Sequence, residues 1–139
     1  MQTKLIEDVL YGPALMLGGS RLENDELIKL AREEFDGQPF CIVRNWMMLD
    51  ILLPENEERD VRKRGLQPTV LLVHEAVFDS EGRIAARDSF ITGFQKDYYG
   101  CFLESEETLF ILAGRGFRKH VSSPAFQALN AYGNTGIRA

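Results

Sequence analysis

Apolar residues recur at helical spacing in several segments of the chain, with charged residues on the opposite face. Asn24 precedes one of these stripes and is expected at its N-cap position, because its side chain can accept a hydrogen bond from the free backbone N–H groups there. The pattern predicts helices at residues 3–11, 24–35, 55–64 and 123–132.

Between the helical segments lie apolar and β-branched runs that predict strands. The run at residues 40–53 is longer than a usual strand, so we expect a bend or break near Asn45. The run at residues 69–79 is apolar on both faces and is expected at the centre of the sheet. Gly114 and Gly116 are expected to end the sheet. The predicted strands are residues 14–17, 40–53, 69–79, 83–92, 101–104 and 108–113.

This order of elements predicts a single α+β domain over residues 1–139. A chain of 139 residues has the usual size of one domain and can bury its own core. We expect a mostly antiparallel sheet of about five strands, flanked by three or four short helices. Residues 133–139 are expected to form a flexible tail.

The balance of charges narrows the classes of partner. Sixteen Lys and Arg residues against 21 Asp and Glu residues give a net charge of −5, which disfavours binding to nucleic acid and to anionic membranes. The longest uncharged stretch, residues 9–20, is too short to span a bilayer. Two cysteines without a CxxC spacing are typical of buried thiols in a reducing compartment, so we expect a cytoplasmic protein.

His74 is the first candidate for chemistry, because histidine titrates near neutral pH and Glu75 follows it. Adjacent strand residues point to opposite faces, so these two side chains cannot share a site. A catalytic His74 needs a partner from another strand, and a Cys–His pair is chemically feasible. The spacing selects no partner, so no catalytic residue is assigned, and a histidine in the core or in a cleft is the simpler interpretation. The candidate partners are Cys41, Cys101, Asp50 and Glu104.

A locally basic segment runs from Gly114 to His120. Backbone N–H groups of a glycine turn, together with arginine side chains, can bind a phosphate or a carboxylate. The segment lacks the full spacing of the phosphate-binding fingerprints, so a solvated turn is the simpler interpretation. The histidines and cysteines show no metal-ligand spacing, and we expect neither a metal nor a cofactor. The candidate anion site consists of Arg44, His74, Arg115, Arg118 and Lys119.

Apolar and aromatic residues supply a candidate interface. Trp46 and Met48 lie in the long strand, where the core is the default location and a partner interface is the alternative. Tyr98 and Tyr99 lie in a predicted loop, where large amphipathic rings are good anchors for a partner. These four residues form the candidate interface.

Several segments together resemble a family of small proteobacterial proteins that share a domain of unknown function. The segments are residues 40–46 (FCIVRNW), His74, residues 78–83 (FDSEGR) and residues 112–119 (LAGRGFRK). The resemblance covers residues 18–120 and contains no mechanistic motif, so no catalytic role passes to these positions. It implies a bacterial cytoplasmic setting, with mobile or accessory DNA as one source.

Two functions of different class remain open. The first is a non-catalytic protein-interaction module, such as a regulator, an inhibitor or an immunity-type protein, that binds another protein or a second copy of itself. Small size, negative charge and the lack of a catalytic signature favour it over an enzyme. The alternative is a small enzyme or ligand-binding domain that holds an anionic small molecule in a cleft near His74.

Overall fold

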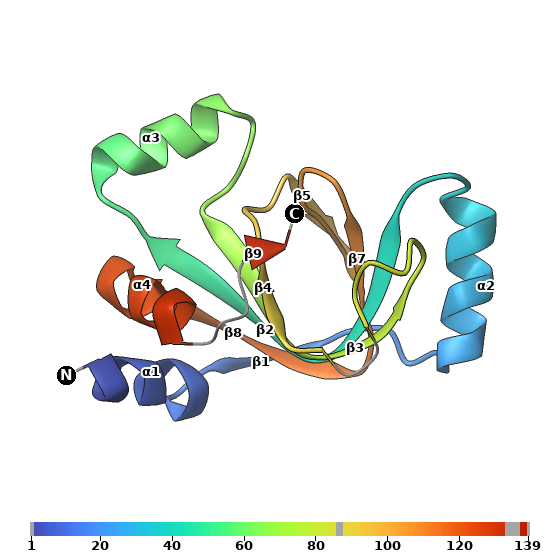
Figure 1. The fold of residues 1–139 in the computed structure, drawn as a ribbon, viewed down its shortest axis with the longest axis horizontal. Coiled ribbons are helices and arrows are strands. Elements are labelled where there is room, and N and C mark those ends of the chain that lie inside the picture. Colours follow the sequence, from blue (N-terminus) through green and yellow to red (C-terminus); the bar gives the residue numbers. More distant parts are fainter. Residues whose placement is uncertain (1, 86–87, 133–136, 139) are drawn as a thin grey trace.

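A strongly curled β-sheet organises the chain (Figure 1). The computed structural model describes residues 2–85, 88–132 and 137–138. The expected single α+β domain is confirmed. The helices are α1 (Gln2–Tyr11), α2 (Asn24–Glu34), α3 (Glu55–Lys63) and α4 (Ser123–Tyr132). The strands are β1 (Leu15–Gly18), β2 (Phe40–Leu52), β3 (Thr69–Asp79), β4 (Phe90–Thr92), β5 (Asp97–Tyr99), β6 (Phe102–Glu104), β7 (Leu109–Leu112), β8 (Arg115–Ser122) and β9 (Ile137–Arg138).

The sheet is mixed, and it has nine strands where the sequence predicts about five. Its order is β5-β6-β7-β2-β3-β4-β9, with β8 also beside β2 and β1 beside β8. β2 pairs antiparallel with β3 but parallel with both β7 and β8, and β4 pairs parallel with β9. The expectation of a mostly antiparallel sheet therefore holds only in part. Strand periodicity is the same in both kinds of pairing, so the sequence pattern could not distinguish them.

β2 bends at the expected place, and the bend changes which side chains face inward. Asn45 has a φ angle of 52°, in the left-handed region that asparagine tolerates better than most residues. Val43 and Trp46, three positions apart, both pack inside the curl. Arg44 lies toward α2, where it contacts Asn24. A regular strand would place Arg44 and Trp46 on the same face, and the bend separates them.

The glycines at positions 114 and 116 do not end the sheet, contrary to the prediction. Gly114 has a φ angle of 70° and lies between β7 and β8. Residues of β7 pair with β2 residues that lie 69 positions earlier in the chain, whereas residues of β8 pair with β2 residues 70 positions earlier. One extra residue is therefore inserted between β7 and β8, as in a β-bulge. The extra residue lets the chain follow the bend in β2, so the strand continues as β8.

Gly116 makes room for a tryptophan ring. A Cβ atom at Gly116 would lie 2.3 Å from atoms of the Trp46 indole, which is buried inside the curl. The indole N–H donates a hydrogen bond to the Ala113 carbonyl at 3.2 Å. The missing side chain at position 116 is therefore a packing requirement and not a strand break.

Apolar side chains fill both sides of the sheet. Inside the curl lies a cluster that includes Trp46 and Phe90. On the outer side, α1 and α4 lie next to each other and cover one half of the sheet, with Val9 and Leu129 buried there (Figure 1). α2 covers the other half through Leu27. Between these two helical covers, the outer surface of the sheet is bare (Figure 1).

Several boundaries differ from the predicted ones. The return strand expected at residues 83–92 is reduced to β4, and the loop expected at residues 93–100 contains β5. Of the tail predicted at residues 133–139, residues 137–138 form β9 and pair with β4. The remainder of that tail lies outside the described residues.

The start of α2 differs in a way that matters for the site. Glu23 takes the N-cap position expected for Asn24, and Glu23 and Glu26 form a capping box. The Asn24 side chain is therefore not used for capping. Its amide oxygen accepts two hydrogen bonds from Arg44.

Candidate functional site

Exposed apolar side chains lie on the bare outer surface between the helical covers. Met16 on β1 is 56% exposed and Phe117 on β8 is 41% exposed. The two residues are partners in the β1–β8 ladder, so their side chains lie next to each other on one face. Leu15, on the opposite face of β1, is 66% exposed. We call Leu15, Met16 and Phe117, with the outer backbone edge of β1, the β1 surface.

β1 is an edge strand. Within the described parts of the chain it pairs with β8 alone. The Gly19 N–H donates to the Gly114 carbonyl at 2.7 Å. Every second residue of an antiparallel strand directs its N–H and C=O groups to the partner strand, so those of Leu15 and Leu17 also point to β8. Those of Met16 and Gly18 point outward. The strand has no Lys, Pro or bulge of the kind that usually protects an edge.

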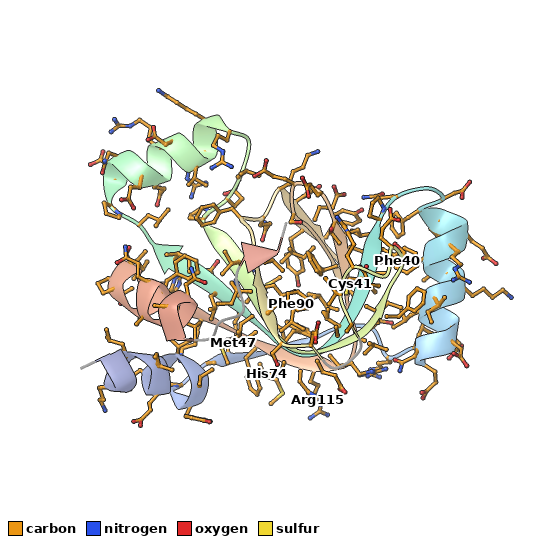
Figure 2. The ribbon with its side chains drawn as sticks, viewed as in Figure 1. Phe40, Cys41, Met47, His74, Phe90 and Arg115 are labelled. Atoms are coloured by element: carbon orange, nitrogen blue, oxygen red, sulfur yellow. The ribbon has the colours of Figure 1, made fainter. Side chains whose placement is uncertain are left out.

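Two of the predicted anion-site residues, His74 and Arg115, are exposed on the outer side of the sheet (Figure 2). The apolar cover under α1 and α4 includes Leu72, and two positions further along β3 His74 lies outside that cover. This placement differs from the core or cleft position expected for His74. Five well-formed hollows lie in the described part of the chain, and His74 lines none of these five.

Arg44 and Arg115 line one hollow, together with Arg21. The hollow has a volume of about 580 Å³ and lies where residues 18–24 pass the turn between β7 and β8. Arg44 Nε and Nη2 donate to Asn24 Oδ1 at 3.1 and 2.9 Å. Two of the five predicted anion-site residues therefore come together, beside an arginine that sequence reasoning missed.

Arg118 points into a different hollow, of about 800 Å³, at the open end of the curl. Its Nε and Nη2 donate to the two carboxylate oxygens of Asp50 at 2.8 and 2.9 Å, and Thr69 donates to the same carboxylate at 2.8 Å. Burial alone would raise the pKa of Asp50, but the hydrogen bonds from Arg118 and Thr69 outweigh it and hold this pKa below its ordinary value. The Arg118 charge is therefore compensated within the chain.

Replacing Asp50 with asparagine is expected to lower the free energy of unfolding at neutral pH by about 1–2 kcal/mol, because the charged hydrogen bonds are lost from a pair that is partly shielded from water. The folded-state pKa of Asp50 lies below its ordinary value of 3.8. Its stabilisation is therefore complete above that value and is lost as the pH falls through the folded-state pKa. Urea unfolding of both proteins from neutral to strongly acidic pH should show the difference shrinking in acid.

A matched control for this prediction is Glu58→Gln. Glu58 pairs with Arg62 at 3.3 Å, but both side chains are about half exposed, more than those of Asp50 and Arg118. Loss of such a pair is expected to cost less than about 0.5 kcal/mol. Equal losses from the two substitutions, or a difference that persists in acid, would contradict the role assigned to Asp50.

Lys119 is also engaged within the chain. Its Nζ donates to the backbone carbonyls of Asp8 and Val9, the latter at 3.2 Å, near the C-terminal end of α1. A positive charge stabilises a helix at this end. Burial lowers the pKa of Lys119. Lys119 therefore holds α1 to the sheet and does not join Arg44 and Arg115.

Two of the four candidate interface residues are buried, in the core location expected for them by default. Trp46 and Met48 are 1% and 0% exposed, because both lie inside the curl after the bend in β2. Tyr98 is half-buried against the same cluster. Tyr99 is the most exposed of the four side chains.

The two cysteines are free thiols. Burial raises the pKa of Cys41 to about 12, and burial also raises the pKa of Cys101. Both thiols are therefore protonated at neutral pH and are poor nucleophiles. Cys41 packs inside the curl while His74 is exposed on the outer surface, so the structure does not bring these two together.

In the described residues, no three His, Cys, Asp or Glu side chains are placed to hold a metal ion. The helices of the same residues are all too short or too polar to cross a membrane.

Comparison with known families decides where the chain belongs. A family model described as "Domain of unknown function (DUF6957)" matches residues 18–128. The chain belongs to the DUF6957 family. The resemblance to a domain of unknown function is thereby confirmed, and the DUF6957 match extends beyond residue 120 into α4. Comparison with curated proteins and with solved structures finds no match to this chain.

The DUF6957 match includes every residue of the arginine hollow. It includes Phe117 of the β1 surface, whereas Leu15 and Met16 precede it. The description of the DUF6957 family names no activity.

Sequence reasoning missed the β1 surface in this DUF6957 domain. The strand itself was predicted, but periodicity does not distinguish an edge strand from a central one. One signal could have found it. Residues 9–20 carry no charge in a chain that is 27% charged, and a protected edge strand usually carries one.

Proposed function

We propose that this DUF6957 domain is a non-catalytic protein-interaction module that binds another protein through the β1 surface. The observation that carries the proposal is the outer edge of β1. This edge is uncharged and is flanked by Leu15 and Met16, which are 66% and 56% exposed. An extended segment of a partner that pairs with β1 satisfies the outward backbone groups of Met16 and Gly18 and covers the apolar side chains.

Two further observations support this proposal. Phe117 enlarges the apolar area beside Met16, and aromatic residues are enriched at interfaces. The two free thiols suit a reducing compartment, so we place the protein in the cytoplasm. A second copy of the chain is the alternative partner, because a two-fold axis can pair β1 with its own counterpart.

The earlier alternative placed an anionic ligand in a cleft near His74. His74 lines none of the five hollows. The hollow lined by Arg21, Arg44 and Arg115 does not include His74 and is the better place for an anion.

Photo-crosslinking in the cells that make the protein tests the interaction. A photoreactive residue in place of Met16 is expected to give a covalent adduct with the partner, and Phe117→Lys is expected to lower its yield about tenfold by removing an apolar contact. The matched control is the same residue in place of Leu52, which is 58% exposed at the end of β2. The mass of the adduct distinguishes a second copy from another protein.

Adducts from the Leu52 position in equal yield show that mere exposure, and not a binding surface, accounts for the labelling. No adduct from the Met16 position also contradicts the proposal.

A further inference from the structure

Three arginines line a hollow beside the end of β1. Arg21 comes from the loop before α2, Arg44 from β2 and Arg115 from the start of β8. The hollow has a volume of about 580 Å³, within the range of small-molecule sites. Three glycines also line it, so the main chain there is open to a ligand. They are Gly18, Gly19 and Gly114.

Arg44 is held in place by its neighbours. Its Nε and Nη2 donate to Asn24 Oδ1 at 3.1 and 2.9 Å. Its Nη1 lies against Gly114, where an added Cβ atom would be 3.2 Å away. The residue is half-buried. Asn24 therefore orients the guanidinium group, but its neutral amide leaves the positive charge uncompensated.

No carboxylate of the described residues lies within 4.0 Å of any of these three guanidinium groups. Every ion pair among the described residues joins residues other than Arg21, Arg44 and Arg115. Glu23 also lines the hollow, but with Glu26 it forms the capping box of α2. Arg118 is different, because Asp50 compensates its charge. In a chain with a net charge of −5, three uncompensated arginines around one hollow create a local positive potential.

We propose that this hollow binds a phosphate group, either as the free ion or as the monoester of a small molecule. Guanidinium groups match phosphate oxygens with paired N–H donors, which makes arginine the preferred residue for such groups. The orientation of Arg44 by Asn24 lowers the entropy lost on binding. The proposal does not rest on the protein interaction, because the apolar side chains of the β1 surface, those of Leu15, Met16 and Phe117, do not line the hollow. Gly18 at the end of β1 is the one residue that the two sites share.

NMR titration of the ¹⁵N-labelled chain with sodium phosphate tests the site, with sodium chloride at equal ionic strength as the reference. The backbone amide signals of Gly18, Gly19 and Gly114 are expected to shift saturably with phosphate only. Arg21→Gln and Arg115→Gln alter exposed side chains, so the fold is retained. Each is expected to weaken phosphate binding about tenfold, because a charged donor is lost.

The matched control is Arg59→Gln on α3, an exposed arginine with a carboxylate partner, Glu55. It is expected to bind phosphate as the unmodified chain does. Adenosine 5′-monophosphate and adenosine separate the two sources of phosphate. Binding of the monophosphate at least as tight as that of phosphate, with none of adenosine, assigns a phosphorylated small molecule. Binding of inorganic phosphate alone assigns the free ion.

Two results overturn the proposal. One is that phosphate shifts no signal beyond the effect of chloride. The other is that Arg21→Gln, Arg115→Gln and Arg59→Gln all bind phosphate with the same affinity. Neither result bears on crosslinking at Met16, so failure of this site and failure of the interaction surface can be told apart.

Discussion

Replacing Trp46 with alanine is expected to lower the free energy of unfolding by about 3–5 kcal/mol, the usual range for removal of a large buried aromatic side chain. Trp46 is 1% exposed inside the curl. Its indole N–H donates to the Ala113 carbonyl and so ties β2 to the turn between β7 and β8. Alanine leaves a cavity and removes the partner of a buried carbonyl. Urea unfolding followed by circular dichroism measures the change.

Tyr99→Ala is the control for this prediction. Tyr99 is also aromatic but is 43% exposed, so its removal is expected to cost less than about 1 kcal/mol. A loss at Trp46 no larger than the loss at Tyr99 would show that the tryptophan does not anchor the interior of the curl.

Gly116→Ala is expected to destabilise the fold by about 1–3 kcal/mol, the range for overpacking a filled interior. The added Cβ atom would lie 2.3 Å from the middle of the Trp46 ring, and a buried ring has little room to move away. The same substitution made together with Trp46→Leu is expected to cost less, because the ring that it meets is gone. A coupling energy above about 0.5 kcal/mol between the two sites measures this contact.

Gly18→Ala is the matched glycine control. A Cβ atom at Gly18 meets no atom within 4 Å, so this substitution in β1 is expected to change stability little. If both alanine variants are equally stable, or if the two effects at positions 46 and 116 simply add, the close packing of Gly116 against Trp46 is wrong.

Much of the fold follows from local pattern. The strand predicted at residues 69–79 matches β3 at both ends, because a run that is apolar on both faces and bounded by turn residues has few alternatives. The bend near Asn45 is confirmed for a similar reason, since asparagine tolerates a positive φ. Gly114 and Gly116 mislead, because a strand glycine can end a strand, form a bulge or make room for a neighbour. Only the tertiary structure distinguishes these cases.

The site was less predictable than the fold. The sequence places Arg44 and Arg115 in one candidate anion site, and the structure brings them to one hollow. It could not show that Arg118 is paired with Asp50, which lies 68 positions away. Nor could it show that Lys119 binds the end of α1. Such partners are set by packing between distant elements, which leaves no local period in the sequence.

The parallel neighbours of β2 also limit the order in which the chain can fold. β7 and β8 follow their partners in β2 by 69 and 70 positions. A long loop must therefore close before these strands pair with β2, and pairings across such a long loop form slowly. β3 is the next strand along the chain and can pair with β2 early. During synthesis the other edge of β2 therefore stays open until residues 109–122 have left the ribosome, and the interior of the curl cannot close before then.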